Sequence, residues 1–225
     1  TKIRLNSIVQ SIEYSRKQIE VKTNNRTYLA DKVIVSVPLQ VLKNGGITFI
    51  PELPQTKLAA MQKAIVWDGF KAFFEFKTNF YGEDEYVFPI NPETDGQKIY
   101  YNASLGQRTN THILGLFVVG IPAQTYISLT DNDLRDFILR ELDQIYSNQA
   151  TPNYLRHITQ NWNKEPYIQA GYLSDYADSS TVKELGQAVG NTLYFAGGEY
   201  TDGKDWVSVH TAATSAKRVV DILTN

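Results

Sequence analysis

The most constraining feature of this sequence is a short apolar run that no charged side chain interrupts. Residues 33–37 have the sequence Val-Ile-Val-Ser-Val, and Pro38 ends the run. A strand that is apolar on both faces is typical of a parallel sheet covered on both sides, whereas a half-exposed strand alternates apolar with polar residues. The run therefore predicts a buried parallel strand. Together with the helices described next, it places the fold in the α/β or α+β class.

Strand and helix patterns share the rest of the chain. Residues 3–37 favour β-structure, with a hairpin turn at 23–26 that contains two Asn residues. Thr130 and Asp133 form a capping box ahead of an amphipathic segment. Apolar periodicity predicts strands at 70–80, 86–90, 97–103, 112–120, 154–161 and 193–196, and helices at 54–65, 134–145 and 209–223.

The composition excludes several classes of protein. The 22 Lys and Arg nearly balance the 24 Asp and Glu, so we expect no electrostatic nucleic-acid binder and no polybasic membrane-surface protein. The absence of Cys excludes disulfides, thiolate zinc sites, iron–sulfur clusters and cysteine nucleophiles. The only histidines, His112, His157 and His210, are scattered, so we expect no metal site. No apolar run approaches the roughly 18 residues of a membrane helix and no leader pattern is present, which predicts a cytoplasmic protein without a membrane segment.

Four segments carry residues suited to binding a cofactor or substrate. In chain order they are Asp31-Lys-Val-Ile-Val-Ser-Val-Pro38, Asp68-Gly-Phe-Lys71, Trp162-Asn-Lys-Glu-Pro-Tyr167 with Gly171-Tyr172, and Leu193-Tyr-Phe-Ala-Gly-Gly-Glu199 with the small-residue helix that follows. In this order and at this spacing, they resemble the C-terminal half of the flavin-containing amine oxidases, the monoamine and polyamine oxidase family. The resemblance covers nearly the whole chain and is most specific in the third and fourth segments.

One part of the family pattern is missing. The dinucleotide-binding fingerprint Gly-x-Gly-x-x-Gly does not occur in the 225 residues. The resemblance therefore implies a fragment, with residues 1–45 and 163–225 forming part of an FAD-binding domain. Residues 46–162 would form a substrate domain with a mixed β-sheet flanked by helices. The partner of this chain would be the missing N-terminal part of the same protein, and the fragment alone would lack FAD.

The resemblance also implies where FAD binds. The Gly197-Gly198-Glu199 turn would approach the phosphates and ribityl chain, because glycine allows close backbone contact. The N-terminal N–H groups of the last helix, at Val209, would point at the pyrimidine edge of the flavin. The backbone of Val9 would meet the adenine.

Aromatic residues of the third segment complete the implied flavin site. Trp162 would pack beside the flavin ring, and Tyr167 would be a further cofactor-binding residue. Gly171 falls where some relatives carry the cysteine that binds flavin covalently, which predicts a non-covalent flavin. Without the resemblance, these aromatics are ordinary core residues, and Gly197-Gly198 is an ordinary turn after a strand.

The resemblance names one catalytic and three substrate-binding residues. Lys71 would hold a water against the flavin N5, where its charge stabilises the negative charge that develops on oxygen. Without the resemblance, Lys71 is a solvated lysine at the end of a strand. Tyr172 would form one wall of an aromatic cage that attracts a cationic amine. The second wall, often Tyr or Thr in relatives, falls at Ser208, so the cage would have one aromatic wall at most unless Trp206 supplies the other.

Other residues of the last helix depart from the family pattern. Thr211-Ala212 replaces a Gly-Ala pair, and Ser215-Ala216 replaces a Ser-Gly pair. These departures, with Ser208, leave the identity of the substrate open.

The function implied for the parent protein is FAD-dependent oxidation of an amine or amino acid. Hydride passes to flavin, the resulting imine is hydrolysed, and O2 reoxidises the flavin to give H2O2. This chemistry needs no metal. Two alternatives stay open: a related flavoprotein such as a desaturase or porphyrinogen oxidase, against which the Trp-x4-Tyr and Gly-Tyr patterns argue, and a non-catalytic module that kept the fold.

Overall fold

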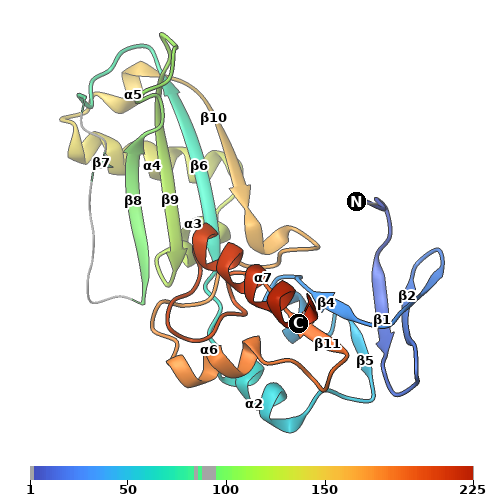
Figure 1. Ribbon diagram of the computed structural model, residues 1–225. Coiled ribbons are helices and arrows are strands. Elements are labelled where there is room, and N and C mark those ends of the chain that lie inside the picture. The colour runs from blue at the N-terminus through green and yellow to red at the C-terminus, as the bar shows by residue number, and fades with distance from the viewer. Residues whose placement is uncertain (1–2, 84–85, 88–94, 225) are drawn as a thin grey trace. The chain divides into compact units, whose positions relative to one another are not determined.

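The chain forms two compact units. Figure 1 shows the computed structural model, which describes residues 3–83, 86–87 and 95–224. One unit is Trp67–Pro166, and the other combines Thr1–Val66 with Tyr167–Asn225. The middle of the sequence therefore builds one unit, and the two ends together build the other.

A five-stranded sheet forms the middle unit. Its strands lie in the order β10, β6, β9, β8, β7, and the pairings between described strands are all antiparallel. The elements of this unit are β6 (Gly69–Phe76), β7 (Tyr86–Val87), β8 (Gly96–Asn102), β9 (His112–Gly120), α3 (Ala123–Ser128), α4 (Asp131–Ile145), α5 (Ala150–Asn153), β10 (Tyr154–Asn161) and the 3-10 turn η1 (Trp162–Lys164).

One face of this sheet packs against α4 (Figure 1). Along β6 the side chains alternate: Phe70 and Phe74 are buried, whereas Lys71 between them is half-buried on the other face. The buried face of the sheet meets Ile138 and Leu142 of α4 in one apolar cluster. The helix begins where the capping box predicted, because the Thr130 side chain accepts a hydrogen bond from the N–H of Asp133.

A network of polar side chains joins α3 and α4 to strand β8 of this sheet. Glu141 of α4 accepts hydrogen bonds from the hydroxyl of Tyr100 on β8 at 2.8 Å and from that of Tyr126 on α3 at 2.7 Å. Lys98 forms an ion pair with the other carboxylate oxygen. Burial, reinforced by the charge of Glu141, raises the pKa of both tyrosines. They therefore stay protonated and keep donating.

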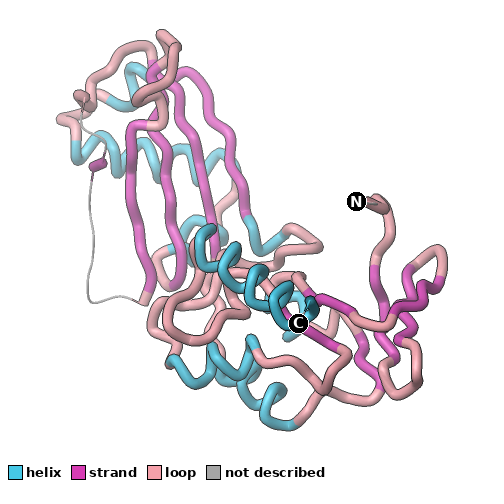
Figure 2. The backbone as a smooth tube through the Cα atoms, viewed as in Figure 1, coloured by secondary structure: helices cyan, strands magenta, loops and turns pink. Residues whose placement is uncertain are grey.

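The unit built from the chain ends combines two sheets with helices (Figure 2). A four-stranded sheet has the order β3, β2, β1, β5, and a two-stranded parallel sheet pairs β11 with β4. The elements are β1 (Val9–Glu13), β2 (Ile19–Thr23), β3 (Thr27–Ala30), β4 (Val33–Val35), α1 (Leu39–Lys43), β5 (Thr48–Ile50), α2 (Gln55–Lys63), α6 (Ser179–Gly186), β11 (Leu193–Phe195) and α7 (Val209–Thr224).

Three expectations differ from the structure in their details. The strand at 33–37 is parallel as predicted, but it is only three residues long and Ile34 is 45% exposed, because no described element covers its outer side. The sheet of the middle unit is antiparallel rather than mixed, and a mixed sheet occurs instead in the other unit, where β1 pairs parallel with β5. The strand predicted at 70–80 ends at Phe76 because Phe80 turns back onto it, with ring centroids 4.9 Å apart.

The unit boundaries also fall elsewhere than the expected domain boundaries. Residues 46–66, expected in the substrate domain, lie in the unit of the chain ends because α2 packs on α6 of that unit. Assigning a flavin or substrate role to either unit remains a prediction. Of the strand predicted at 86–90, residues 88–90 lie outside the described residues.

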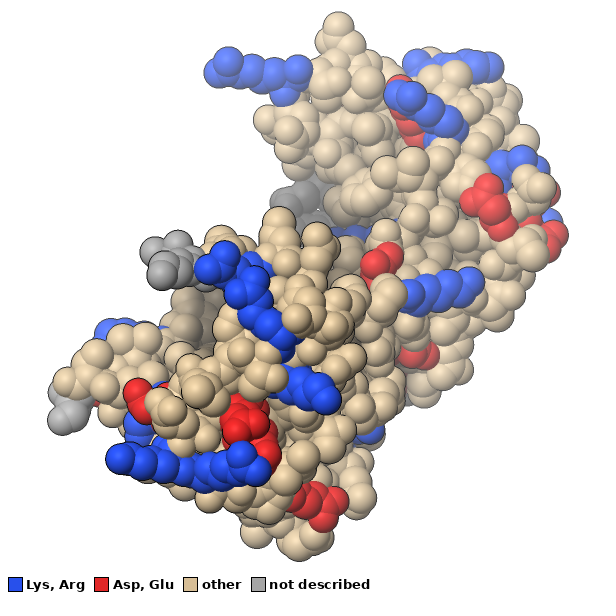
Figure 3. All heavy atoms as spheres, turned by 90° about the vertical axis from the view of Figure 1, so that its right-hand side faces the viewer, with Lys and Arg blue, Asp and Glu red and all other residues tan. Residues whose placement is uncertain are grey.

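The surface and the helices add two further observations. On the face shown in Figure 3, basic and acidic side chains are interspersed. Over the part of the chain that the structure describes, no helix is both long and apolar enough to span a membrane.

The core of the middle unit predicts the effect of one substitution on stability. Ile138 is fully buried against the sheet, so Ile138→Ala should lower the free energy of unfolding by about 2–5 kcal/mol, measured by urea unfolding. Ile145→Ala on the same helix is the control, because that side chain is 40% exposed and should change stability by about 0.5 kcal/mol or less. Equal effects of the two substitutions would contradict the packing of α4.

Candidate functional site

The turn at residues 196–199 follows the buried strand β11. Gly197 has a φ of +149°, a conformation that side-chain-bearing residues rarely adopt. Gly198 has no such requirement: an added Cβ would lie 3.5 Å from the Val207 backbone, which is an ordinary contact. Backbone conformation therefore explains the first glycine, whereas packing within the chain does not require the second.

Helix α7 and strand β4 hold this turn from two sides. The Ser215 hydroxyl accepts a hydrogen bond from the Gly197 N–H at 2.8 Å and lies 3.0 Å from the Gly197 carbonyl oxygen. The Tyr200 hydroxyl donates to the Val37 carbonyl at 2.7 Å, just past β4. The turn is thus fixed by side chains that flank it and by the Val207 N–H, which donates to the Gly198 carbonyl at 2.9 Å.

Glu199 directs its carboxylate into the unit. The carboxylate accepts a hydrogen bond from the Leu39 N–H at 2.6 Å, at the start of α1, and another from the Leu173 N–H. Burial raises the pKa of Glu199, while the two N–H groups and the charge of Lys43 act in the opposite direction. Glu199 thereby connects three segments that are distant in sequence.

Ser208 caps the start of α7. Its backbone N–H donates to the Thr211 hydroxyl at 3.1 Å, and its carbonyl accepts from that hydroxyl at 2.8 Å, an arrangement like a capping box. Val207, immediately before the cap, has a φ of +64°, which is strained for a β-branched residue. Val209, the first residue of the helix, is 89% exposed. The conformation of the helix N-terminus is therefore set by hydrogen bonds between Ser208 and Thr211, and the first residue of the helix is exposed to solvent.

The segment at 171–174 lies beside Trp206. The indole N–H of Trp206 donates to the Ser174 carbonyl at 3.1 Å, and the Ser174 N–H donates to the Ile65 carbonyl at 2.9 Å. Tyr172 is half-buried, and burial, together with the nearby charge of Asp175, raises its pKa to about 12. The two aromatic residues expected to form the cage thus come from adjoining, well-anchored segments.

Lys71 and Trp162 belong to the middle unit. Lys71 is the third residue of β6, paired with Gln160 on one side and Phe117 on the other, so it is not at a strand end. Its ammonium lies 5.4 Å from the centre of the Phe117 ring. Trp162 opens η1 and is half-buried.

The predicted site residues are therefore divided between the units. Lys71 and Trp162 lie in the middle unit, and the others lie in the unit of the chain ends. There, Val9 begins β1 and packs against the same apolar core as Trp206, whereas Tyr167 is 61% exposed. The remaining predicted residues belong to the turn after β11, to the start of α7 or to the segment that both contact. They are Gly197, Gly198, Glu199, Ser208, Val209 and Tyr172.

Sequence reasoning missed the residues that brace the turn. Ser215 was noted only as a departure from the family pattern, and Arg218, three residues further along the helix, was not singled out. Their spacing puts them on one face of α7, which is the available sequence signal.

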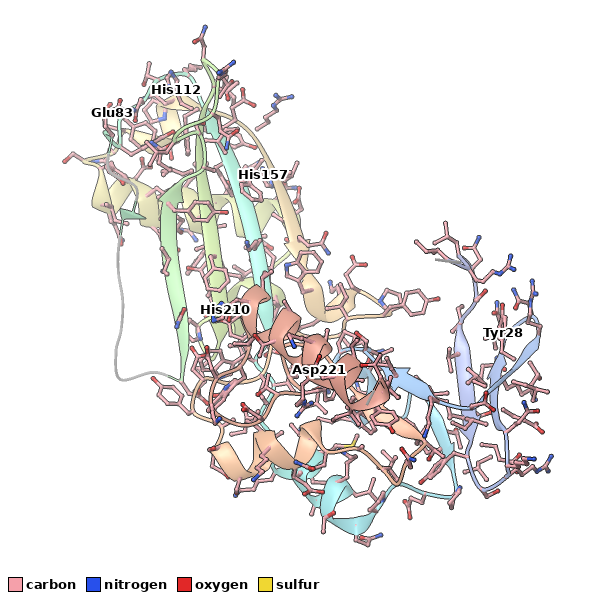
Figure 4. The ribbon with its side chains drawn as sticks, in the orientation of Figure 1. Tyr28, Glu83, His112, His157, His210 and Asp221 are labelled. Carbon is pink, nitrogen blue, oxygen red and sulfur yellow. The ribbon has the colours of Figure 1, made fainter. Side chains whose placement is uncertain are left out.

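His112 and His157 lie in the middle unit, and His210 lies in the unit of the chain ends (Figure 4). His210 lies near the start of α7 and pairs with Asp205 at 3.1 Å. His157 contacts Tyr154 at 2.7 Å and Asp131 at 3.1 Å. Among the described residues, no group of three His, Asp or Glu side chains could hold a metal ion.

Comparison with known proteins settles the family. A family model described as flavin containing amine oxidoreductase matches residues 1–224. The chain belongs to the flavin-containing amine oxidoreductase family.

Curated members of this family are longer than the chain. Lysine-specific histone demethylase 1 homolog 1 of Arabidopsis thaliana is 29% identical over 94% of this chain and 26% of that protein. Polyamine oxidase 4 of Oryza sativa subsp. japonica is 29% identical over 97% of this chain and 44% of that protein. The chain thus spans less than half the length of these relatives.

Solved structures share the fold. Wild-type putrescine oxidase bound to putrescine matches with a TM-score of 0.79, at 18% identity over 98% of this chain and 49% of that one. Cyclohexylamine oxidase from Brevibacterium oxydans matches with a TM-score of 0.70, at 16% identity over 94% of this chain and 48% of that one. The predicted α/β class is confirmed for this flavin-containing amine oxidoreductase chain.

The buried carboxyl of Glu199 predicts a pH dependence of stability. Because its pKa is raised in the folded state, the folded protein binds this proton more tightly than the unfolded chain, and stability is lost as pH rises from about 4.3 through the folded pKa. Glu199→Gln removes this titration. Urea unfolding at several pH values should therefore show wild type losing stability relative to the variant as pH rises.

Groups that titrate alike in wild type and in Glu199→Gln do not contribute to the difference in stability between the two proteins. Glu52→Gln, at an exposed carboxyl, is the control and should give a profile parallel to that of wild type. If wild type instead gains stability relative to the Glu199→Gln variant as pH rises, the two N–H groups lower the pKa of Glu199 by more than burial raises it. The assigned direction is then wrong.

Proposed function

We propose that the complete protein is an FAD-dependent amine oxidase. The observation that carries the proposal is the match of the flavin-containing amine oxidoreductase model to residues 1–224, which include the Gly197-Gly198 turn after β11. When bound, FAD would supply the acceptor for a hydride, which is two electrons and one proton, from the carbon next to the amine, and two electrons with two protons would then go to O2 to give H2O2. The residues of this chain would bind and orient both molecules.

The residues around the turn fit FAD. Glycine at 198 is not required by packing within the chain, so close approach of a bound group accounts for it. The 16-residue helix α7 starts at the exposed Val209, and its first N–H groups lack partners within the helix. Such a helix end favours negative charge, which is what a reduced flavin carries. The proposed adenine contact at the Val9 backbone completes this part of the site.

Without a cysteine in the chain, we propose that the flavin is non-covalent. Residues upstream of this chain would supply the dinucleotide-binding fingerprint, as the partial coverage of the relatives supports. The exposed side of β4, where Ile34 lies, offers that segment an apolar surface. Residues 1–45 and 163–225 would then form the FAD-binding part and 46–162 the substrate part. A cytoplasmic location remains a prediction.

The aromatic residues would orient the amine. Tyr172 and Trp206 would provide apolar, electron-rich faces, while Trp162 and Tyr167 would pack against the cofactor. Ser208 leaves the cage with one polar wall, and its own backbone is committed to the helix cap. A cage of this kind favours a cationic amine on a flexible chain over a bulky aromatic amine.

A second candidate substrate is a methylated lysine within a peptide. The observation that favours it is the similarity to proteins named lysine-specific histone demethylases, such as the first relative described above. Both candidates are cationic amines, so the residues of this chain would treat them alike at the reacting carbon. The regions outside this chain would decide between a free polyamine and a peptide.

The first experiment tests for flavin and for its reduction by amines. We expect the complete protein to be yellow and its flavin band to bleach when putrescine, spermidine or a dimethyl-lysine peptide is added without O2. Bleaching by the peptide alone would select the second candidate. A flavin that none of the amines bleaches would point to a related flavoprotein with another reaction. A protein purified without flavin, and unable to bind added FAD, would contradict the proposal.

The second experiment tests Lys71. In the complete protein, Lys71→Met removes one positive charge from a half-buried position while keeping the apolar stem. Flavin should stay bound, and reoxidation of the reduced protein by O2 should slow by about 10²–10³-fold, because the negative charge developing on oxygen loses a neighbouring cation.

The matched control is Lys77→Met, an exposed lysine just after the same strand, whose loss should leave the oxygen reaction unchanged. Stopped-flow mixing of reduced protein with O2 gives the rate constants. An unchanged rate for Lys71→Met would remove Lys71 from the site.

A further inference from the structure

Arg218, which lies outside the predicted site, forms hydrogen bonds with residues on both sides of the glycine turn. The guanidinium of Arg218, on α7, donates through Nη1 to the Thr201 carbonyl at 3.2 Å. Its Nη2 shares its hydrogens among the carbonyls of Gly186 at 3.1 Å, Phe195 at 3.3 Å and Tyr200 at 3.0 Å. Phe195 lies just before the turn at 196–199, and Tyr200 and Thr201 lie just after it. A single group therefore sets the distance between the entry and the exit of the turn.

The end of α6 leaves room for this guanidinium because its last residue has no side chain. Gly186 is the last residue of α6, and a Cβ added there would lie 2.0 Å from the Thr201 carbonyl oxygen and 3.1 Å from Arg218 Nη1. Any other residue would push the helix end and the chain after the turn apart. Glycine at this position lets the carbonyls of two segments converge on one cation.

A buried lysine supports the same region. Lys57 of α2 donates to the Glu184 carbonyl at 2.8 Å and to the Leu185 carbonyl at 2.9 Å. Its ammonium also lies 4.2 Å from the centre of the Phe195 ring. Two cations thus take the last three carbonyls of α6, where the negative end of the helix dipole favours positive charge. Both of them also contact Phe195, the residue that leads into the turn.

Geometry explains why arginine is needed at position 218. A guanidinium presents five N–H donors in a planar fork, so it reaches carbonyls on several segments at once. A lysine ammonium is a point donor and would reach fewer of them. The hydrogen bonds of Arg218 go to residues on either side of the turn, so it acts on Gly197 and Gly198 through the backbone it holds.

We propose that Arg218 is a positioning residue for flavin binding. It holds the 196–199 turn in the conformation that presents the backbone of Gly197 and Gly198 to the cofactor. This inference rests on the proposed function, because it takes that turn as the one that FAD approaches.

The test compares three variants of the complete protein. Arg218→Met removes the donors and keeps an apolar stem, and Arg218→Lys keeps the charge without the fork. Lys217→Met is the control, because Lys217 is exposed and its ion pair, at 2.6 Å, joins it only to Asp221 on the surface of the same helix. The readouts are the rate of flavin release, followed by fluorescence, and hydrogen exchange of residues 195–201, with the strands at 9–23 of the same unit as an internal reference.

Arg218→Met should release flavin about tenfold faster or more, and exchange at 195–201 should accelerate while exchange at 9–23 stays the same. Arg218→Lys should fall between Arg218→Met and wild type, and Lys217→Met should equal wild type. With saturating FAD, Arg218→Met should regain the wild-type KM for the amine, since Arg218 does not contact substrate. If Arg218→Met does not fold, Arg218→Lys carries the same comparison.

Two results would overturn the inference. One is unchanged flavin release and unchanged exchange at 195–201 in the Arg218 variants. The other is exchange that rises equally at 9–23, which would make Arg218 a general stabiliser of the unit. A wild-type protein that binds no FAD would instead reject the proposed function, and this outcome is seen before any variant is made.

Discussion

The buried carboxylate of Glu199 is the contact on which the unit of the chain ends depends. Its oxygens accept backbone N–H groups from Leu39 and Leu173, the first of them 160 positions away in sequence. A carboxylate in an apolar interior is costly unless such donors satisfy it. The start of α1, the segment after residue 170 and the exit of β11 must therefore stay together. Next to Leu173, the Ser174 carbonyl accepts the indole N–H of Trp206, so Trp206 lies beside the segment that carries Tyr172.

The turn is held by contacts from α7, from β4 and from Val207, just before α7. Ser215 binds Gly197, and Arg218 joins the residues on either side of the turn. The Val207 N–H donates to the Gly198 carbonyl, and the packing of the chain does not require glycine at this position. Rigid support around a half-buried glycine backbone is an arrangement that lets a binding site meet a ligand without reorganising. The family match relates this arrangement to flavin binding, since the flavin is the group that members of this family share.

Patterns local in sequence predicted much of the fold. The nine-residue strand β9 and the capped helix α4 were predicted correctly, because alternation, capping and helical periodicity are properties of neighbouring residues. Helix α6 was missed although Asp178 caps it and Gly186 ends it, which are signals that the sequence contains. Strand β5 and the exposure of Ile34 depend on distant pairing that short runs do not encode. The candidate site came from motif order, whereas its bracing did not, because backbone N–H and carbonyl groups carry no residue signature.

The central claim is that the turn after β11 is where this protein meets its flavin. A crystal structure of the complete protein, purified with its yellow cofactor, tests that claim most directly. Our account predicts phosphate or ribityl oxygens of FAD within hydrogen-bond distance of the backbone at Gly197, Gly198 or Glu199. A flavin bound with no atom in contact with this turn would contradict it.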